Sequence, residues 1–273
     1  MANIPITIRR GLQPVIFALL VLSTDPSQAR ENAYDVLGKA LVPLVKALIA
    51  TPEMQSHSAA STLVLDSATN LPAADAGDTL EIALQSPDKL RLHATVAGQS
   101  FTVCRDGQQA WASPGSQIQA LIDAQKLPKP DPDYKLTVFN LPIKEKQLVW
   151  LPLLFQADDR GDEAVDGQNC MVLDVSLMPD LARAAKLEDY SARLWVRADY
   201  KLAKIELRKS PGTAREWRAV ILVKNPQYAS SLPPETWKPT PAEAADLLQL
   251  TPVRYKQLVD FISAHWAAWK SEK

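Results

Sequence analysis

The amino-acid sequence predicts an α+β protein built mainly from antiparallel strands. Three observations lead to this fold class: many short runs alternate apolar and polar residues, compact turn signals separate the runs, and amphipathic helical patterns occur near both ends of the chain. Residues 86–112, SPDKLRLHATVAGQSFTVCRDGQQAWA, show the first two together. Alternation with a period of two marks strands with one buried and one solvated face, and Asp106-Gly107 suits the positive φ angles of a tight hairpin.

Residues 1–29 have the pattern of a secretory signal peptide. Arg9 and Arg10 form a positive start, residues 15–22 a short apolar segment, and Ser27-Gln28-Ala29 a small-x-small cleavage site. The apolar segment is shorter than the ~20 residues of a membrane-spanning helix, so a retained anchor is the weaker alternative. The first mature residue would be Arg30 and not the Cys of a bacterial lipid anchor. We therefore expect a soluble periplasmic protein with no transmembrane segment after cleavage.

The mature chain opens with a predicted amphipathic helix. Its apolar residues recur at helical spacing, and they are Leu37, Leu41, Leu44, Val45 and Leu48. Pro43 lies inside this pattern and predicts a kink, and the helix is expected to end near Pro52.

The predicted strands follow in two groups. The first contains alternating runs around residues 63–65, 80–84, 90–96 and 101–112, with turns at 97–100 and 105–108 that make neighbouring strands antiparallel. The second contains NCMVLDVSL, SARLWVRA, KLAKIELRK and EWRAVILVKN, with a turn at residues 198–201. Between the groups the alternation breaks. There GSQIQALIDAQKL predicts a short helix, and KEKQLVWLPLLFQ, interrupted by Pro152, is expected to cover the sheet.

A second helix is predicted at the C-terminal end, after the proline-rich passage SLPPETWKPTPAEA. Leu258, Ile262, Trp266 and Trp269 share one stripe of this helix, so it should pack on the rest of the protein. No internal repeat and no Gly/Ser-rich linker divides the chain. We expect residues 30–250 to form one domain, with residues 251–273 as a helical extension packed on it.

The charge balance argues against a nucleic-acid-binding protein. Without residues 1–29 the chain has 28 basic and 30 acidic residues, a net charge of −2. Nucleic-acid binding needs a concentrated basic face, and this balance gives no electrostatic attraction to anionic lipid surfaces either.

The sequence contains no recognisable catalytic or metal centre. Only His57, His93 and His265 could serve as catalytic histidines, and no G-x-S-x-G elbow accompanies them; His93 alternates with apolar neighbours and is expected to face solvent. Residues 158–167, DDRGDEAVDG, gather five carboxylates without the ligand order of an EF-hand loop, so we predict a solvated acidic loop. Phosphate-binding glycine motifs are absent. We expect no enzyme activity, no metal and no cofactor.

Cysteines and tryptophans each leave two interpretations open. Cys104 and Cys170 both lie in strand-like runs, where a small buried hydrophobe is the simpler interpretation, while an oxidising compartment would permit a disulfide between them. The seven tryptophans are expected mainly in the core, with the lining of a ligand cavity as the alternative.

Five short motifs, in this order and spacing, resemble a known family. They are LQSPDKLRLHA, VCRDGQQAWA, VDGQNCMVLDV, RLWVRADYKLAKIEL and LPPETWKPTP. Together they are similar to the outer-membrane lipoprotein carriers (LolA/LolB-like proteins) and their relatives among periplasmic lipid-binding and envelope-stress sensor domains, over roughly residues 33–245. Two features depart from the pattern: Ser86 stands before Pro87 where carriers often have a basic residue, and the C-terminal helix extends beyond the common core.

The resemblance implies a fold and a function. The fold is a curved open antiparallel sheet, a half-barrel, whose apolar concave face is covered by helices and binds the acyl chains of lipids or lipoproteins without enzymatic chemistry. Residues 30–250 would be the lipid-binding domain, and we expect a monomer. The candidate apolar cavity residues are Leu90, Leu92, Val103, Leu194, Val196, Ile205 and Leu207, with Trp111 at the rim. The alternative is a sensor or scaffold module that binds an envelope protein partner through the same fold.

Overall fold

The structure is a computed structural model that describes residues 31–49, 56–71, 75–124, 133–136, 145–209 and 216–260. The predicted signal peptide (1–29) lies outside these residues, as do Pro52, Ile262, Trp266 and Trp269. The described residues from Ala33 onward form one compact unit, which is described by itself. None of the described helices has the length and apolarity needed to cross a membrane.

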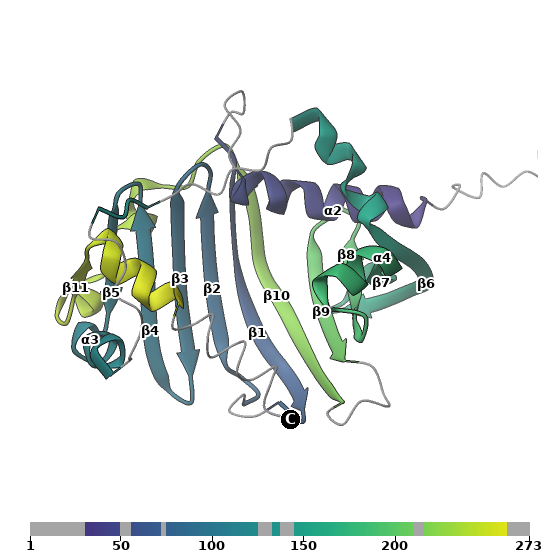
Figure 1. The fold of residues 1–273 in the computed structure, drawn as a ribbon. Coiled ribbons are helices and arrows are strands. Elements are labelled where there is room, and N and C mark those ends of the chain that lie inside the picture. The colour runs from purple at the N-terminus through teal and green to yellow at the C-terminus, as the bar shows by residue number, and fades with distance from the viewer. Residues whose placement is uncertain are drawn as a thin grey trace, which may run out of the picture. The chain divides into compact units, whose positions relative to one another are not determined.

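The centre of the fold is an antiparallel sheet of eleven strands in the order β11-β5-β4-β3-β2-β1-β10-β9-β8-β7-β6. The strands are β1 (Ser58–Thr69), β2 (Thr79–Gln85), β3 (Lys89–Val96), β4 (Gln99–Asp106), β5 (Gln109–Ser113), β6 (Phe155–Val165), β7 (Gln168–Leu177), β8 (Tyr190–Arg197), β9 (Leu202–Lys209), β10 (Trp217–Ala229) and β11 (Leu248–Leu250). The described strands leave the sheet open, with β11 and β6 at its edges, and Figure 1 shows it curving. This confirms the predicted fold class.

The three predicted turns are confirmed as hairpins. Val96 pairs with Gln99 across one of them, and Asp106 pairs with Gln109 across the next. Gly107 has a φ of +65°, which a glycine adopts without a Cβ clash. The third turn joins β8 to β9, where the Arg197 N–H donates to the Lys201 carbonyl at 2.9 Å.

The acidic stretch 158–167 is not a loop, and this prediction was wrong. Most of it belongs to β6, which pairs with β7 and has a register irregularity between Asp159 and Asp162, where Gly161 has a φ of +98°. Because β6 is an edge strand, most of its side chains are exposed and can be charged. Because the register irregularity and the charged side chains interrupt the apolar–polar alternation, the sequence pattern did not indicate a strand here.

Helix α2 (Ala33–Leu48) covers one face of the sheet and includes Pro43, as predicted. Figure 1 shows it running crosswise to the strands. Its buried residues Val36, Leu37 and Ala40 pack with apolar residues of β7, β8 and β10. The buried stripe is rotated from the predicted one, because Leu48 is 50% exposed.

A second cluster lies on the same face at the other end of the sheet. Helix α3 (Gly115–Ala124), predicted from the sequence, contributes Ile118 and Ile122. Residues 252–260 are helical and bury Leu258 in this cluster beside β5 and β11. The described part of the C-terminal helix is therefore packed against the sheet.

The opposite face of β3 and β4 is also covered, so His93 does not face open solvent as predicted. The short helices η2 (Pro234–Trp237) and α5 (Pro241–Ala244) lie on it. His93 Nδ1 is 2.7 Å from Thr102 Oγ1, and Thr102 donates to Glu243 at 2.6 Å. Arg91 Nη2 donates to both carboxylate oxygens of Glu243, at 2.7 and 2.9 Å.

On β7 to β10 this same face carries ion pairs. Arg193 donates to Asp174 at 2.6 Å across β7 and β8, and Glu206 is paired with Arg218 across β9 and β10. A hydrogen bond from Arg193 lowers the pKa of Asp174 and outweighs the opposing effect of partial burial. Each of these two carboxylates is shared by more than one arginine, because Arg208 also lies within ion-pair distance of both Asp174 and Glu206.

Candidate functional site

A groove of about 1130 Å³ lies between α2, the 3₁₀ segment η1 (Glu145–Leu154), the β8–β9 turn and β10. Leu148 and Pro152 are the buried residues of η1, and Gly38 of α2 allows Pro152 to come close. A Cβ at position 38 would lie 2.9 Å from Pro152 Cγ. The two elements therefore pack closely at Gly38 and Pro152, and both of these residues also line the groove.

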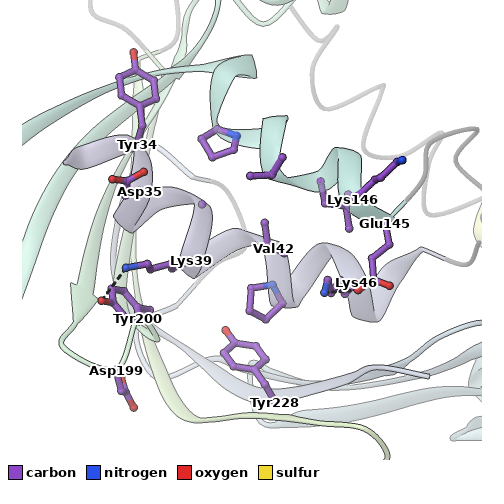
Figure 2. Close-up of a pocket in the computed structure, with 15 residues that line it drawn as sticks. Tyr34, Asp35, Lys39, Val42, Lys46, Glu145, Lys146, Asp199, Tyr200 and Tyr228 are labelled. Atoms are coloured by element: carbon purple, nitrogen blue, oxygen red, sulfur yellow. Dashed lines mark hydrogen bonds and ion pairs between the residues drawn. The ribbon is translucent and has the colours of Figure 1, made fainter. Parts of the chain in front are cut away.

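The groove has apolar walls, tyrosines and balanced charges. The apolar lining residues are Val42, Pro43, Leu148, Val149 and Pro152, and the tyrosines are Tyr34, Tyr200 and Tyr228. The charged lining residues are Asp35, Lys39, Lys46, Glu145, Lys146 and Asp199. Figure 2 shows Glu145 and Lys146 on one side of α2 and Tyr200 and Tyr228 on the other.

Two lysines of α2 are held in place by groove partners. Lys46 contacts Glu145 at 2.5 Å, and this hydrogen bond lowers the pKa of Glu145. Lys39 donates to the Tyr200 hydroxyl at 3.1 Å, and its ammonium lies 4.4 Å from the centre of the Tyr200 ring. Burial raises the pKa of Tyr228, so its hydroxyl stays neutral at physiological pH.

The groove lining combines apolar walls with lysines, carboxylates and tyrosines. The lining residues include no histidine, cysteine or serine, and the described residues contain no cluster of three His, Cys, Asp or Glu side chains that could hold a metal. An elongated apolar molecule with a polar end matches the apolar walls and the lysine and tyrosine groups beside them.

None of the residues predicted for the cavity lines this groove. Leu194 and Val196 lie on the face that α2 covers, but they are only 6% and 1% exposed and fill the core beneath the helix. Ile205 packs against the same core. This part of the expected cavity is occupied by side chains of α2.

The other predicted strand residues share the α2 face without entering the groove. Leu92 pairs directly with Val103, so their side chains lie on one face, and Val103 packs against the α3 cluster. Leu90 lines a separate pocket of about 160 Å³, and Leu207 is 37% exposed. The structure therefore brings the apolar sides of the strands onto one face, as the alternation predicted.

Trp111 is not a rim residue of a cavity on the α2 face. Its neighbours Ala110 and Ala112 belong to the α3 cluster, so Trp111 projects from the opposite face. There it is 6% exposed, and its indole N–H donates to the Trp237 carbonyl at 3.2 Å. The core-packing interpretation is the correct one for this tryptophan.

The disulfide that the sequence left open is not formed, and both cysteines are free and buried. Cys104 packs with Trp111 and Trp237, whereas Cys170 packs with Val172 and Trp195. Six strands separate their strands β4 and β7 in the sheet. Burial raises the pKa of Cys104 to about 12, so its thiol is unreactive at neutral pH.

Sequence inspection missed the groove residues because they come from distant segments. The apolar KEKQLVWLPLLFQ segment was a signal, since it was expected to cover the sheet, and it supplies Leu148, Val149 and Pro152. Gly38 inside an apolar helix was a second signal, because a glycine there permits close approach. Nothing in the sequence indicates that Tyr200 lies beside α2.

Comparison with protein families and with curated proteins finds no match to the sequence. Solved structures similar to this chain include the Pseudomonas aeruginosa MucA/MucB complex, with a TM-score of 0.41 and 14% identity, covering 81% of this chain and 64% of that chain. The Mycobacterium tuberculosis lipoprotein LppX has a TM-score of 0.35 and 11% identity, covering 71% and 94%. A LolA superfamily protein from Nitrosomonas europaea has a TM-score of 0.27 and 9% identity, covering 77% and 98%.

These structures include the LolA superfamily that the sequence motifs resemble. The chain spans 64% of the length of the chain matched in the MucA/MucB complex. At these levels of identity and TM-score, the similarity carries no information about a ligand or partner of this protein.

Proposed function

We propose that the protein binds the acyl chains of a lipid or lipoprotein, without covalent chemistry, in the groove between α2 and η1. The groove itself carries the proposal: its volume of about 1130 Å³ slightly exceeds the usual range of roughly 300–1,000 Å³ for ligand sites. A chain of methylene groups fits such a space, and each methylene removed from water contributes about 0.8 kcal/mol.

The polar groups beside the groove suit the head of such a ligand. Lys146 is exposed at the edge of the groove, and Lys39 already donates to the Tyr200 hydroxyl. A carboxylate or phosphate could accept hydrogen bonds from these ammonium groups. Because acidic residues balance the basic ones in the lining, affinity is expected to come mainly from the apolar part of the ligand.

The α2–η1 contact controls access in this proposal. The two elements meet where Gly38 faces Pro152, and a small displacement of η1 would widen the groove. A ligand that stabilises the wider state would shift the population toward it.

A fluorescent fatty acid such as cis-parinaric acid tests the proposal by titration. Val42→Asp places a carboxylate on the groove wall and should weaken binding at least tenfold. Leu48→Asp is the matched control, because Leu48 is on the same helix, 50% exposed and outside the groove. Absence of binding by the wild type, or equal effects of the two substitutions, would contradict the proposal.

A second candidate is a sensor or scaffold module that binds a protein of the cell envelope. It is favoured by the filled core under α2, where Leu194 and Val196 are only 6% and 1% exposed and pack in one cluster with the helix. Native mass spectrometry of protein purified from its own cells separates the two: co-purified lipid favours the carrier, and a lipid-free protein that also fails to bind fatty acid favours the scaffold.

We also propose a periplasmic location, based on the signal-peptide pattern of residues 1–29. The intact mass of the protein recovered from the soluble periplasmic fraction should correspond to a chain that begins at Arg30. A chain that retains residues 1–29 in a membrane pellet would contradict secretion.

A further inference from the structure

Half of the exposed large apolar side chains in the described part of the chain gather on two neighbouring elements. We call this the η1–α4 surface; α4 is the helix Pro179–Ala185. Its members are Val149 (68% exposed), Trp150 (63%), Leu153 (56%), Leu154 (43%), Met178 (39%) and Leu181 (41%). The Met178 N–H donates to the Leu154 carbonyl at 2.9 Å, which joins the end of η1 to the start of α4.

The apolar residues of this surface are not part of the hydrophobic core. In η1 the core is supplied by Leu148 and Pro152, which are buried, while Trp150 and Leu153 lie one 3₁₀ turn apart on the outside. Residues 147–154 contain no charged side chain. Soluble proteins rarely expose so many large apolar side chains on two adjoining segments unless these side chains bind a partner or a membrane.

The charges at the border of the surface are close to neutral overall. Glu145 is paired with Lys46 at 2.5 Å, and Asp180 with Arg183 at 3.2 Å. The exposed Lys146 beside η1, and the exposed Lys186 and Glu188 after α4, add a net charge of about +1. A neutral border complements a zwitterionic lipid surface, which has no net charge, better than a strongly charged partner. An exposed tryptophan among leucines is also the composition that favours the boundary between headgroups and acyl chains.

The surface is continuous with the groove. Val149 lines the groove and is also the most exposed member of the η1–α4 surface. A molecule in the groove would therefore lie next to whatever contacts η1. We propose that the η1–α4 surface docks on a lipid bilayer, with Trp150 and Leu153 at the boundary between headgroups and acyl chains, so that the groove faces the membrane.

The choice of a bilayer as occupant rests in part on the proposed function, because acyl chains are found in bilayers. The docking itself can be measured separately. Val42→Asp should weaken fatty-acid binding at least tenfold and leave vesicle binding unchanged, because Val42 is in the groove and not on the η1–α4 surface. If vesicles bind and fatty acid does not, docking stands and the acyl-chain proposal fails.

The test is co-sedimentation of the mature chain with phosphatidylcholine and phosphatidylethanolamine vesicles. The double substitution Leu153→Ser and Leu154→Ser should weaken vesicle binding by at least ~30-fold. Each large apolar side chain that moves from water into the bilayer raises the partition coefficient about tenfold, and the substitution removes two of them. The control is Leu121→Ser with Val259→Ser, whose side chains are 39% and 41% exposed on other helices, and it should change binding less than about threefold. Raising the salt concentration should have little effect, because the border is nearly neutral.

Three results would overturn the proposal. The wild type could fail to sediment with vesicles, or the control could lose as much binding as the η1–α4 variant. Light scattering could also show a wild-type dimer that Leu153→Ser with Leu154→Ser converts to a monomer. In that case the surface is an interface between two copies of this chain.

Discussion

Replacing Glu243 by alanine should strongly destabilise the fold, because this carboxylate of α5 accepts hydrogen bonds from side chains of the sheet. Arg91 donates to it at 2.7 and 2.9 Å, Thr102 at 2.6 Å and the Thr240 N–H at 2.7 Å. The side chains of Arg91 and Glu243 are only 15% and 9% exposed. The substitution removes the only carboxylate among the described residues that Arg91 is shown to contact and leaves its guanidinium charge in a largely buried site with the Thr236 and Lys238 carbonyls.

The expected cost is about 3–5 kcal/mol in the free energy of unfolding, which is typical for removing one partner of a buried ion pair. Burial of the Glu243 carboxyl opposes ionisation, but hydrogen bonds from Thr102 and Thr240 and the charge of Arg91 outweigh it and lower the pKa below its ordinary 4.5. A lowered folded-state pKa means that Glu243 contributes stability above pH 4.5, and that this contribution is lost as pH falls through the folded value.

Urea unfolding at pH 7 and at a series of pH values below 4.5 measures both effects. Glu235→Ala is the matched control, because Glu235 is an exposed glutamate of the same covering segment, and it should cost less than about 0.5 kcal/mol. The difference in stability between wild type and Glu243→Ala should shrink as the pH falls. Equal costs for the two substitutions at pH 7 would refute the assigned role of Glu243.

Four further predictions concern the core, the charged face of the sheet, the thiols and the C-terminal helix. Leu194→Asp should cost at least about 4 kcal/mol or prevent folding, because Leu194 is 6% exposed under α2; urea unfolding measures it. Arg193→Asp should cost about 1–2 kcal/mol, because it places a carboxylate opposite Asp174, 24% exposed; a cost equal to that of Leu194→Asp would show that both faces are equally buried. Cys104 should resist alkylation at pH 8 in the native protein and react in urea, since burial raises its pKa to about 12, and rapid native labelling would contradict this. Leu258→Ala should cost about 2–5 kcal/mol, because Leu258 is 4% exposed in the α3 cluster; no change in the urea midpoint would show that residues 252–260 are not packed.

The strands and hairpins could be predicted because their signals are local. Alternation assigns Leu92 and Val103 to one face, and Asp106-Gly107 marks the hairpin between β4 and β5. The apolar periodicity of residues 33–48 likewise predicted α2. Each signal needs only neighbouring residues, so the fold class followed from the sequence.

The predictions that failed concern residues whose environment is set by contacts with distant parts of the chain. The β6 strand is charged because it lies at the edge of the sheet, and no local pattern indicates that position. Trp111 was correctly expected in a strand, but only the tertiary structure shows that Trp237 covers the face on which it lies. His93 is covered for the same reason, since α5 packs against its strand.

The candidate site could not be predicted from local sequence patterns either, because it also depends on long-range contacts. The sequence alone determined that the apolar sides of the strands share one face, because side chains alternate along a strand whatever the strand packs against. Whether that face is a cavity depends on α2, which fills it around Leu194 and leaves a large groove beside η1. The groove exists because Gly38, Pro152 and Tyr200, far apart in the chain, meet at α2. Only three-dimensional packing brings such residues together.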